Sequence, residues 1–72
     1  DHAVAEVTIP DLFIGRTLAD LRIRQEFQVQ VLAVRAGADE AWDFGPEPEH
    51  ELAADVRLLV LGHRKAIDRF PA

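Results

Sequence analysis

The stretch from Gly15 to Val34, GRTLADLRIRQEFQVQVLAV, constrains the fold most, because it joins a capped helix directly to a β-branched strand. Thr17 is a suitable N-cap, and Asp20, three residues later, can return a hydrogen bond to the cap. After Phe27 the apolar period changes from that of a helix to that of a strand. The predicted faces of this strand are Val29, Val31 and Ala33 on one side and Gln30, Leu32 and Val34 on the other. We therefore expect a helix that feeds a buried strand at the centre of the fold.

The remaining sequence predicts three more strands and a second helix. Residues Ala3–Ile9 alternate between apolar and polar side chains, and Pro10 ends this strand because it has no amide to donate. The other expected elements are a hairpin loop over 35–39, a returning strand over 40–44 in which Trp42 and Phe44 share a face, a last strand within 51–62, and a closing helix over 63–70 with Ala66, Ile67 and Phe70 inward.

The last predicted strand is apolar on both faces. Val56, Leu58 and Val60 occupy one face, and Leu59 and Leu61 lie on the other beside Arg57. Such a strand is normally covered on both sides. The expected fold is α+β, with a small mixed or largely antiparallel sheet in the order β-α-β-β-β-α and two helices packed on one face. Two short helices cover one face only, so we expect a homodimer to cover the other.

Length and charge narrow the class of protein. The 72 residues are expected to form a single domain, 1–72, and the start at Asp1 suggests a fragment of a larger protein. The net charge of −5 argues against nonspecific nucleic-acid binding. No apolar run approaches the ~20 residues of a membrane span, so direct membrane insertion is not expected. The absence of cysteine fits a reducing compartment.

Four segments in order carry a family resemblance. EVTIP, GRTLADLRIR, FQVQVLAV and ADVRLLVLG resemble the TrkA C-terminal domain, also called the RCK C-terminal or RCK_C domain. The resemblance runs from Glu6 to Phe70 and departs from the family pattern where Gln28 replaces the usual turn glycine, where Ala54 replaces the glycine before Asp55, and in one extra residue before Gly62. It implies a cytoplasmic, dimerising, ligand-sensing module attached to potassium channels, potassium uptake systems or other ion transporters.

The same resemblance implies a ligand pocket, because some members bind cyclic di-AMP at the dimer interface. Their pattern is two aliphatics, two residues, Asp, one residue, Arg, five residues, Asn and an aliphatic. Placed on Arg24, it matches at Leu18, Arg24 and Val31, whereas Ala19, Arg22 and Gln30 replace an aliphatic, the Asp and the Asn. The ligand-binding candidates are therefore Leu18, Arg22, Arg24, Gln30 and Val31. An arginine fork suits a phosphate; the simpler interpretation is two solvated arginines and an ordinary strand glutamine.

A second possible anion site is the segment His63–Arg64–Lys65, which opens the last predicted helix. Free amides at a helix start favour anions, and three basic side chains would strengthen the attraction. The simpler interpretation is an exposed helix start whose basic residues oppose the helix dipole.

Other chemistry finds little support in the sequence. The acidic connection around Glu47, Glu49 and His50 lacks a glycine-centred calcium loop, so we expect no metal site there. The chain has no Cys, Tyr or Ser and no glycine-rich phosphate loop, so we expect no enzyme. No cofactor is predicted beyond a small anionic or nucleotide ligand. The hypothesis is a regulatory, ligand-sensing, dimerising domain of a potassium channel or other cation transporter. The alternatives are a structural oligomerisation module with a degenerate pocket and a cyclic di-AMP receptor.

Overall fold

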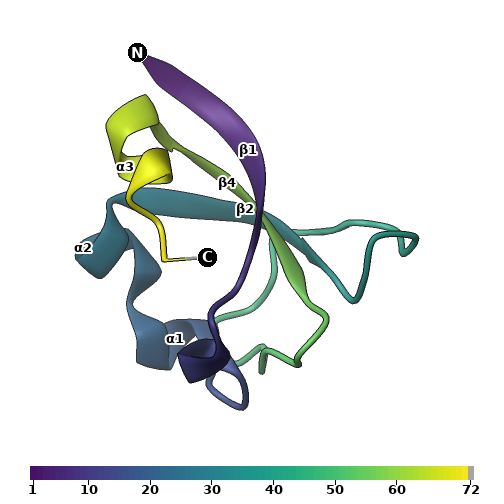
Figure 1. Ribbon diagram of the computed structural model, residues 1–72. Coiled ribbons are helices and arrows are strands. Elements are labelled where there is room, and N and C mark those ends of the chain that lie inside the picture. The colour runs from purple at the N-terminus through teal and green to yellow at the C-terminus, as the bar shows by residue number, and fades with distance from the viewer. Residues whose placement is uncertain (72) are drawn as a thin grey trace.

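The computed structural model describes residues 1–71 and shows a four-stranded sheet (Figure 1). The strand order is β1-β4-β2-β3, so the first strand pairs with the last one along the chain. The strands are β1 His2–Thr8, β2 Val29–Arg35, β3 Asp43–Phe44 and β4 Arg57–His63. Each of these pairings is antiparallel, which confirms the predicted α+β fold and resolves the sheet as antiparallel.

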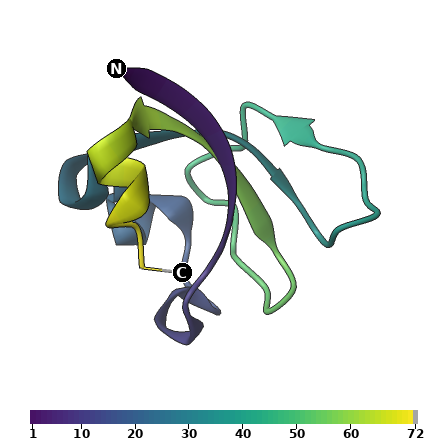
Figure 2. The ribbon, with the colours of Figure 1, turned by 45° about the horizontal axis from the view of Figure 1, so that its top comes forward.

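Short helices cover one face of this sheet, and Figure 2 shows them gathered away from the loop that joins β2 to β3. They are the 3-10 helix η1 Asp11–Phe13 and the α-helices α1 Leu18–Leu21, α2 Ile23–Phe27 and α3 Arg64–Asp68. The pairing register places the buried side chains of the strands on that same face, except for Ala33 of β2. The core consists of Phe13, Ile23, Val29, Val34, Leu52, Val56, Leu58, Val60, Ala66 and Phe70. The predicted facing of β4 and the inward direction of Ala66, Ile67 and Phe70 are confirmed.

The predicted helix from Thr17 to Arg24 begins as expected but is not continuous. The Asp20 amide donates to Thr17 Oγ1 at 3.1 Å, and the Thr17 amide donates to Asp20 Oδ2 at 3.5 Å. The helix then breaks at Arg22, which adopts the left-handed conformation (φ 48°, ψ 49°). In a continuous helix Ile23 would lie roughly 140° around the axis from Leu18. The break lets Leu18 pack against the core while Ile23 is buried within it.

Three phenylalanines from separate segments pack together beneath the sheet. The Phe27 ring lies 5.7 Å from that of Phe13 and 5.4 Å from that of Phe70, and the Phe13 and Phe70 rings are 5.9 Å apart. This cluster explains how one large apolar residue of the loop after β1 is covered. Gln28, next to the cluster, ends α2 with φ 58°. Gln28 therefore adopts the left-handed conformation that the usual turn glycine of the family would adopt at this position.

The predicted alternation of β2 fails in its second half. Val29 and Val31 face the core as expected, but a β-bulge interrupts the register between Val31 and Ala33. A bulge inserts an extra residue and reverses the faces that follow it. Val34 therefore joins the core opposite Leu58, and Ala33 lies opposite Leu59 on the other face.

Two predicted strands have different bounds in the structure. The returning strand, predicted over 40–44, is only Asp43–Phe44. The last strand, predicted within 51–62, is Arg57–His63, so Val56 lies just before it. The segment before β4 instead hydrogen-bonds to the loop that precedes α1: the Gly15 amide donates to the Leu52 carbonyl at 2.8 Å, and the Leu52 amide donates to the Arg16 carbonyl at 2.9 Å. These bonds hold the Leu52 side chain in the core, where it is 1% exposed.

Within residues 1–71, no helix lies on the face of the sheet that carries Leu59 and Leu61. Both leucines are half-buried, whereas Val4 beside them is 54% exposed and Phe44 is 67% exposed. Trp42 lies outside β3, and its ring packs 4.4 Å from the guanidinium carbon of Arg35. Arg35 and Phe44 lie on this same face, so Trp42 and Phe44 share a face as predicted, although only Phe44 is in a strand.

Candidate functional site

A pocket of about 260 Å³ lies where α1 and α2 meet the start of β2. Its lining consists of Leu18, Ala19, Arg22, Ile23, Arg24, Gln25, Val29, Gln30 and Val31. All five predicted ligand-binding residues are in this set. The structure therefore brings them together around one hollow, although they come from two helices and a strand. Their role in binding a ligand stays a prediction.

The local backbone explains why the pocket forms at this point. The break at Arg22 separates the two helices, so side chains from both can line the same hollow. The amides of Leu18 and Ala19 donate to the carbonyls of His50 and Pro48 at 3.1 Å and 2.9 Å. The acidic connection around Glu47, Glu49 and His50 therefore anchors the start of α1. This anchoring holds the apolar wall of the pocket at a fixed position.

The pocket carries positive charge without an internal counter-ion. Arg22, Arg24 and Gln30 are exposed, and Leu18 and Val31 are half-buried. Within residues 1–71, neither guanidinium makes a salt bridge or a side-chain hydrogen bond. Among the described residues that line this hollow, none is Asp or Glu. Because a guanidinium only donates hydrogen bonds, the arrangement suits a ligand rich in acceptors, such as a phosphate or a carboxylate.

A neighbouring hollow of about 400 Å³ continues the site towards the end of β4. It shares Arg24, Val29 and Gln30 with the first pocket and adds His63 and Leu61 to the lining. Arg24 and Gln30 thus stand between the two hollows. A ligand held by these two side chains could extend into either one.

The second predicted anion site does not form as a unit. His63, Arg64 and Lys65 are all exposed, but only His63 lines the hollow beside Arg24. The amides expected to be free are already used, because the Arg64 amide donates to the Asp1 carbonyl at 3.1 Å and the Lys65 amide donates to His63 Nδ1 at 3.2 Å. The helix start therefore offers few of the donors that the hypothesis required.

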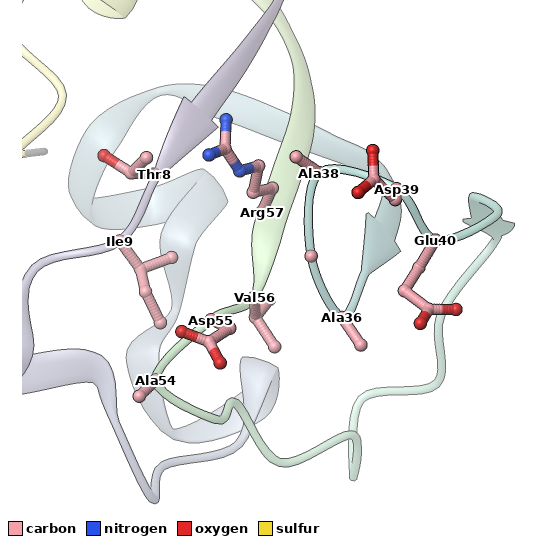
Figure 3. A pocket seen from close by; sticks show the side chains of 11 residues that line it. Thr8, Ile9, Ala36, Ala38, Asp39, Glu40, Ala54, Asp55, Val56 and Arg57 are labelled. Carbon is pink, nitrogen blue, oxygen red and sulfur yellow. The ribbon is translucent and has the colours of Figure 1, made fainter.

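Sequence reasoning missed a larger hollow of about 500 Å³ at the other end of the sheet (Figure 3). The end of β1, the loop after β2 and the segment before β4 form its walls. Asp39, Glu40 and Asp55 bring carboxylates to it, and Arg57 lies with its guanidinium 3.6 Å from Glu6 Oε2. Among residues 1–71, no three His, Asp or Glu side chains are placed to hold a metal ion together. No signal in the sequence marks these carboxylates as a group, since Asp39 and Glu40 come from the loop after β2 and Asp55 from the segment before β4.

None of the described helices is long and apolar enough to cross a membrane.

Comparison with known proteins gives a consistent result. Residues 4–71 match the family model of the TrkA-C domain. No curated protein matches the chain. One similar solved structure is the RCK C domain of the potassium transport protein KtrA in complex with cyclic di-AMP, with a TM-score of 0.83, 22% identity, and coverage of 96% of this chain and 79% of that one.

Two further structures extend the comparison. The GsuK channel bound to NAD has a TM-score of 0.85 and 28% identity over 96% of this chain, which spans only 13% of the GsuK chain. The RCK_C domain dimer of S. agalactiae BusR in complex with cyclic di-AMP has a TM-score of 0.78 and 13% identity, covering 93% of this chain and 88% of that one. BusR has also been determined with its promoter DNA. At 22% and 13% identity, the similarity to KtrA and BusR shows the fold alone.

Proposed function

The chain belongs to the TrkA-C domain family, and we propose that it is the regulatory, ligand-sensing and dimerising domain of a potassium channel or transporter, or of another cation transporter. The proposal is supported by the similar domains of a potassium transport protein and a channel. On this view the chain is a cytosolic, non-catalytic part of a larger protein. The remainder of that protein is its partner.

One observation carries the proposal: five residues picked out by a family pattern line a single pocket with two unpaired guanidiniums. Leu18 and Val31 would contact the apolar part of a ligand, Arg24 would hold a phosphate or carboxylate, and Gln30 would supply a hydrogen-bonding arm. In a surface that served only to pack against another subunit, burying guanidiniums without partners would cost desolvation free energy and add no binding free energy.

We propose that the ligand is smaller and more anionic than cyclic di-AMP. Arg22 replaces an Asp of the family pattern, so a donor stands where a base or ribose would seek an acceptor. An unmade buried hydrogen bond costs about 1–3 kcal/mol, and each ~1.4 kcal/mol is a tenfold change in affinity. Together with the change at Gln30, this replacement would weaken a micromolar site by two decades or more. No cofactor is proposed beyond this ligand.

Dimerisation is the second part of the proposal. The uncovered face of the sheet and the exposed Leu12 and Ile14 after β1 leave more apolar surface than the helices cover. A BusR RCK_C domain forms a dimer, which supports a homodimer here with the pocket between subunits. The predicted absence of a nucleic-acid partner stays a prediction, because BusR is known bound to DNA.

A ligand screen on matched variants tests the proposed pocket. Thermal unfolding is followed with pyrophosphate, adenine nucleotides, dicarboxylates, cyclic di-AMP and divalent cations, since a ligand that binds only the folded state raises its stability. We expect a small anion to raise the melting temperature, Arg24→Ala to remove the shift, and Arg16→Ala to keep it. Arg16 is a matched control because it is exposed and lines none of the hollows described above.

Two outcomes contradict the proposed pocket. If no anion stabilises the chain at millimolar concentration, the structural oligomerisation module is the better account, and the exposed apolar side chains already favour it as the alternative. If Arg16→Ala and Arg24→Ala lose the shift equally, the anion is held by diffuse charge and not by this pocket.

A further inference from the structure

The first strand, β1, leaves one whole edge of the sheet open. It pairs with β4 over all seven residues in an uninterrupted register, and no other strand of residues 1–71 lies beside it. Natural sheets protect such edges with Lys, Pro or a bulge. Between His2 and Thr8 the strand HAVAEVT has none of these devices, and its one acidic or basic residue apart from His2 is Glu6. The edge is therefore able to accept another strand.

The side chains on the uncovered face of β1 indicate what such a strand should carry. His2, Val4, Glu6 and Thr8 lie on this face and are exposed. The guanidiniums of Arg35 and Arg57 both form salt bridges with Oε2 of Glu6, while Oε1 forms none among the described residues. An incoming strand should thus bring an apolar side chain to Val4 and a hydrogen-bond donor to the free oxygen of Glu6.

A second copy of β1 satisfies both requirements in one register. In an antiparallel pair of β1 copies, paired side chains lie on the same face when the two-fold axis passes through a residue, so that this residue pairs with its own copy. Near the middle of the strand this residue can be Val4, Ala5 or Glu6. An axis at Glu6 places two carboxylates opposite each other, and like charges directly opposite are destabilising. An axis at Ala5 places the apolar Val4 opposite the Glu6 carboxylate of the partner subunit and gives that carboxylate no donor. An axis at Val4 pairs the two valines and places each His2 opposite Glu6 of the partner subunit. We propose that a second copy of this chain adds to the sheet along β1, antiparallel and two-fold symmetric about Val4.

This contact uses none of the residues that line the proposed ligand pocket, although His2 also lines the neighbouring hollow that shares Arg24 with it. β1 lies on one side of β4, and β2 with its pocket lies on the other. The edge contact therefore goes beyond the proposed function and stands without it. If the pocket also lies between two subunits, the two isologous contacts would link dimers into a larger assembly.

Register-specific disulfide formation tests the contact, because the chain has no cysteine of its own. In the proposed register the Cβ atoms of residue 4 in the two copies are about 4.5–5.5 Å apart, close to the spacing of a disulfide. Thr8 lies on the same strand and face, but its two copies are eight residues apart along the strand, roughly 26 Å. Leu61, the neighbour of Val4 on β4, is three strand spacings from its copy, roughly 14 Å.

The three single variants Val4→Cys, Thr8→Cys and Leu61→Cys are equilibrated in a glutathione redox buffer and resolved on a non-reducing gel. We expect a disulfide-linked dimer as the main product of Val4→Cys, with at least tenfold less from each of the others. Equal linkage of Val4→Cys and Thr8→Cys would mean random collision. Equal linkage of Val4→Cys and Leu61→Cys would mean that both residues meet their copies across stacked sheet faces, the homodimer contact of the proposed function, and not along the β1 edge. Either result, or no linkage of Val4→Cys, overturns the proposal, and none of them bears on anion binding at the pocket.

Discussion

Leu58→Ala tests the facing of the central strand. Leu58 is 0% exposed and lies opposite Val7 on β1 and Val34 on β2, so its side chain is surrounded within the sheet's covered face. Truncating a buried leucine costs about 2–5 kcal/mol, because the transfer free energy is lost and a cavity is left behind. The total stability of 72 residues is expected to be about 4–11 kcal/mol, from ~0.05–0.15 kcal/mol per residue. The substitution should therefore remove at least about a fifth of the folding free energy, and about half of it at the middle of both ranges.

Urea unfolding followed by circular dichroism measures this loss. Leu59→Ala is the matched control, because Leu59 is the next residue on β4 but is only half-buried on the uncovered face. It should cost about 1 kcal/mol, in proportion to the apolar area that it buries. In thermal melts, a loss of 2 kcal/mol would lower the melting temperature of Leu58→Ala by roughly 8–16 °C. A melting temperature within a degree or two of the parent, or a smaller loss than that of Leu59→Ala, would refute the assigned facing.

Two backbone positions give further predictions. Gln28→Gly should stabilise the chain by up to about 1 kcal/mol in urea unfolding, because Gln28 adopts φ 58°, which glycine adopts without strain. Gln25→Gly is the control within α2 and should destabilise the chain by about 0.5–1 kcal/mol. Loss of stability in both variants would contradict this reasoning. Gly62→Ala should cost at least about 1 kcal/mol, because its Cβ would lie 2.9 Å from Val29 Cγ1 and 3.1 Å from the Gln28 carbonyl oxygen. Gly37→Ala, whose Cβ would meet nothing within 4 Å, is the control, and equal effects of the two would refute the claim of close packing.

The regular parts of the fold were predictable because their sequences are locally consistent. The alternation in β1, the capping box at Thr17 and the two-sided apolar pattern of β4 each specify one structure from a few neighbouring residues. The breaks were not predictable in the same way. An arginine at position 22 gives no sign that it will adopt a left-handed conformation, and a run of valines, leucine and alanine in β2 is equally apolar with or without a bulge.

The contents of the pocket were predictable only through the family resemblance. Composition and spacing alone do not select Leu18 and Val31 from the many aliphatic residues of this chain. What joins them is the turn at Arg22 and the anchoring of α1 by the segment around His50, and both depend on contacts distant in sequence. The hollow between the loop after β2 and the segment before β4 escaped prediction for the same reason.

The central claim is that this pocket is the ligand site and that Arg22 turns it away from cyclic di-AMP. Calorimetric titration of cyclic di-AMP into the parent chain and into the double variant Arg22→Asp/Gln30→Asn tests it directly. Aspartate tolerates the left-handed conformation at position 22 and supplies the missing acceptor. We expect weak or absent binding to the parent and at least tenfold tighter binding to the double variant, lost again when Arg24→Ala is added. A sub-micromolar constant for the parent chain that Arg24→Ala abolishes would contradict the account.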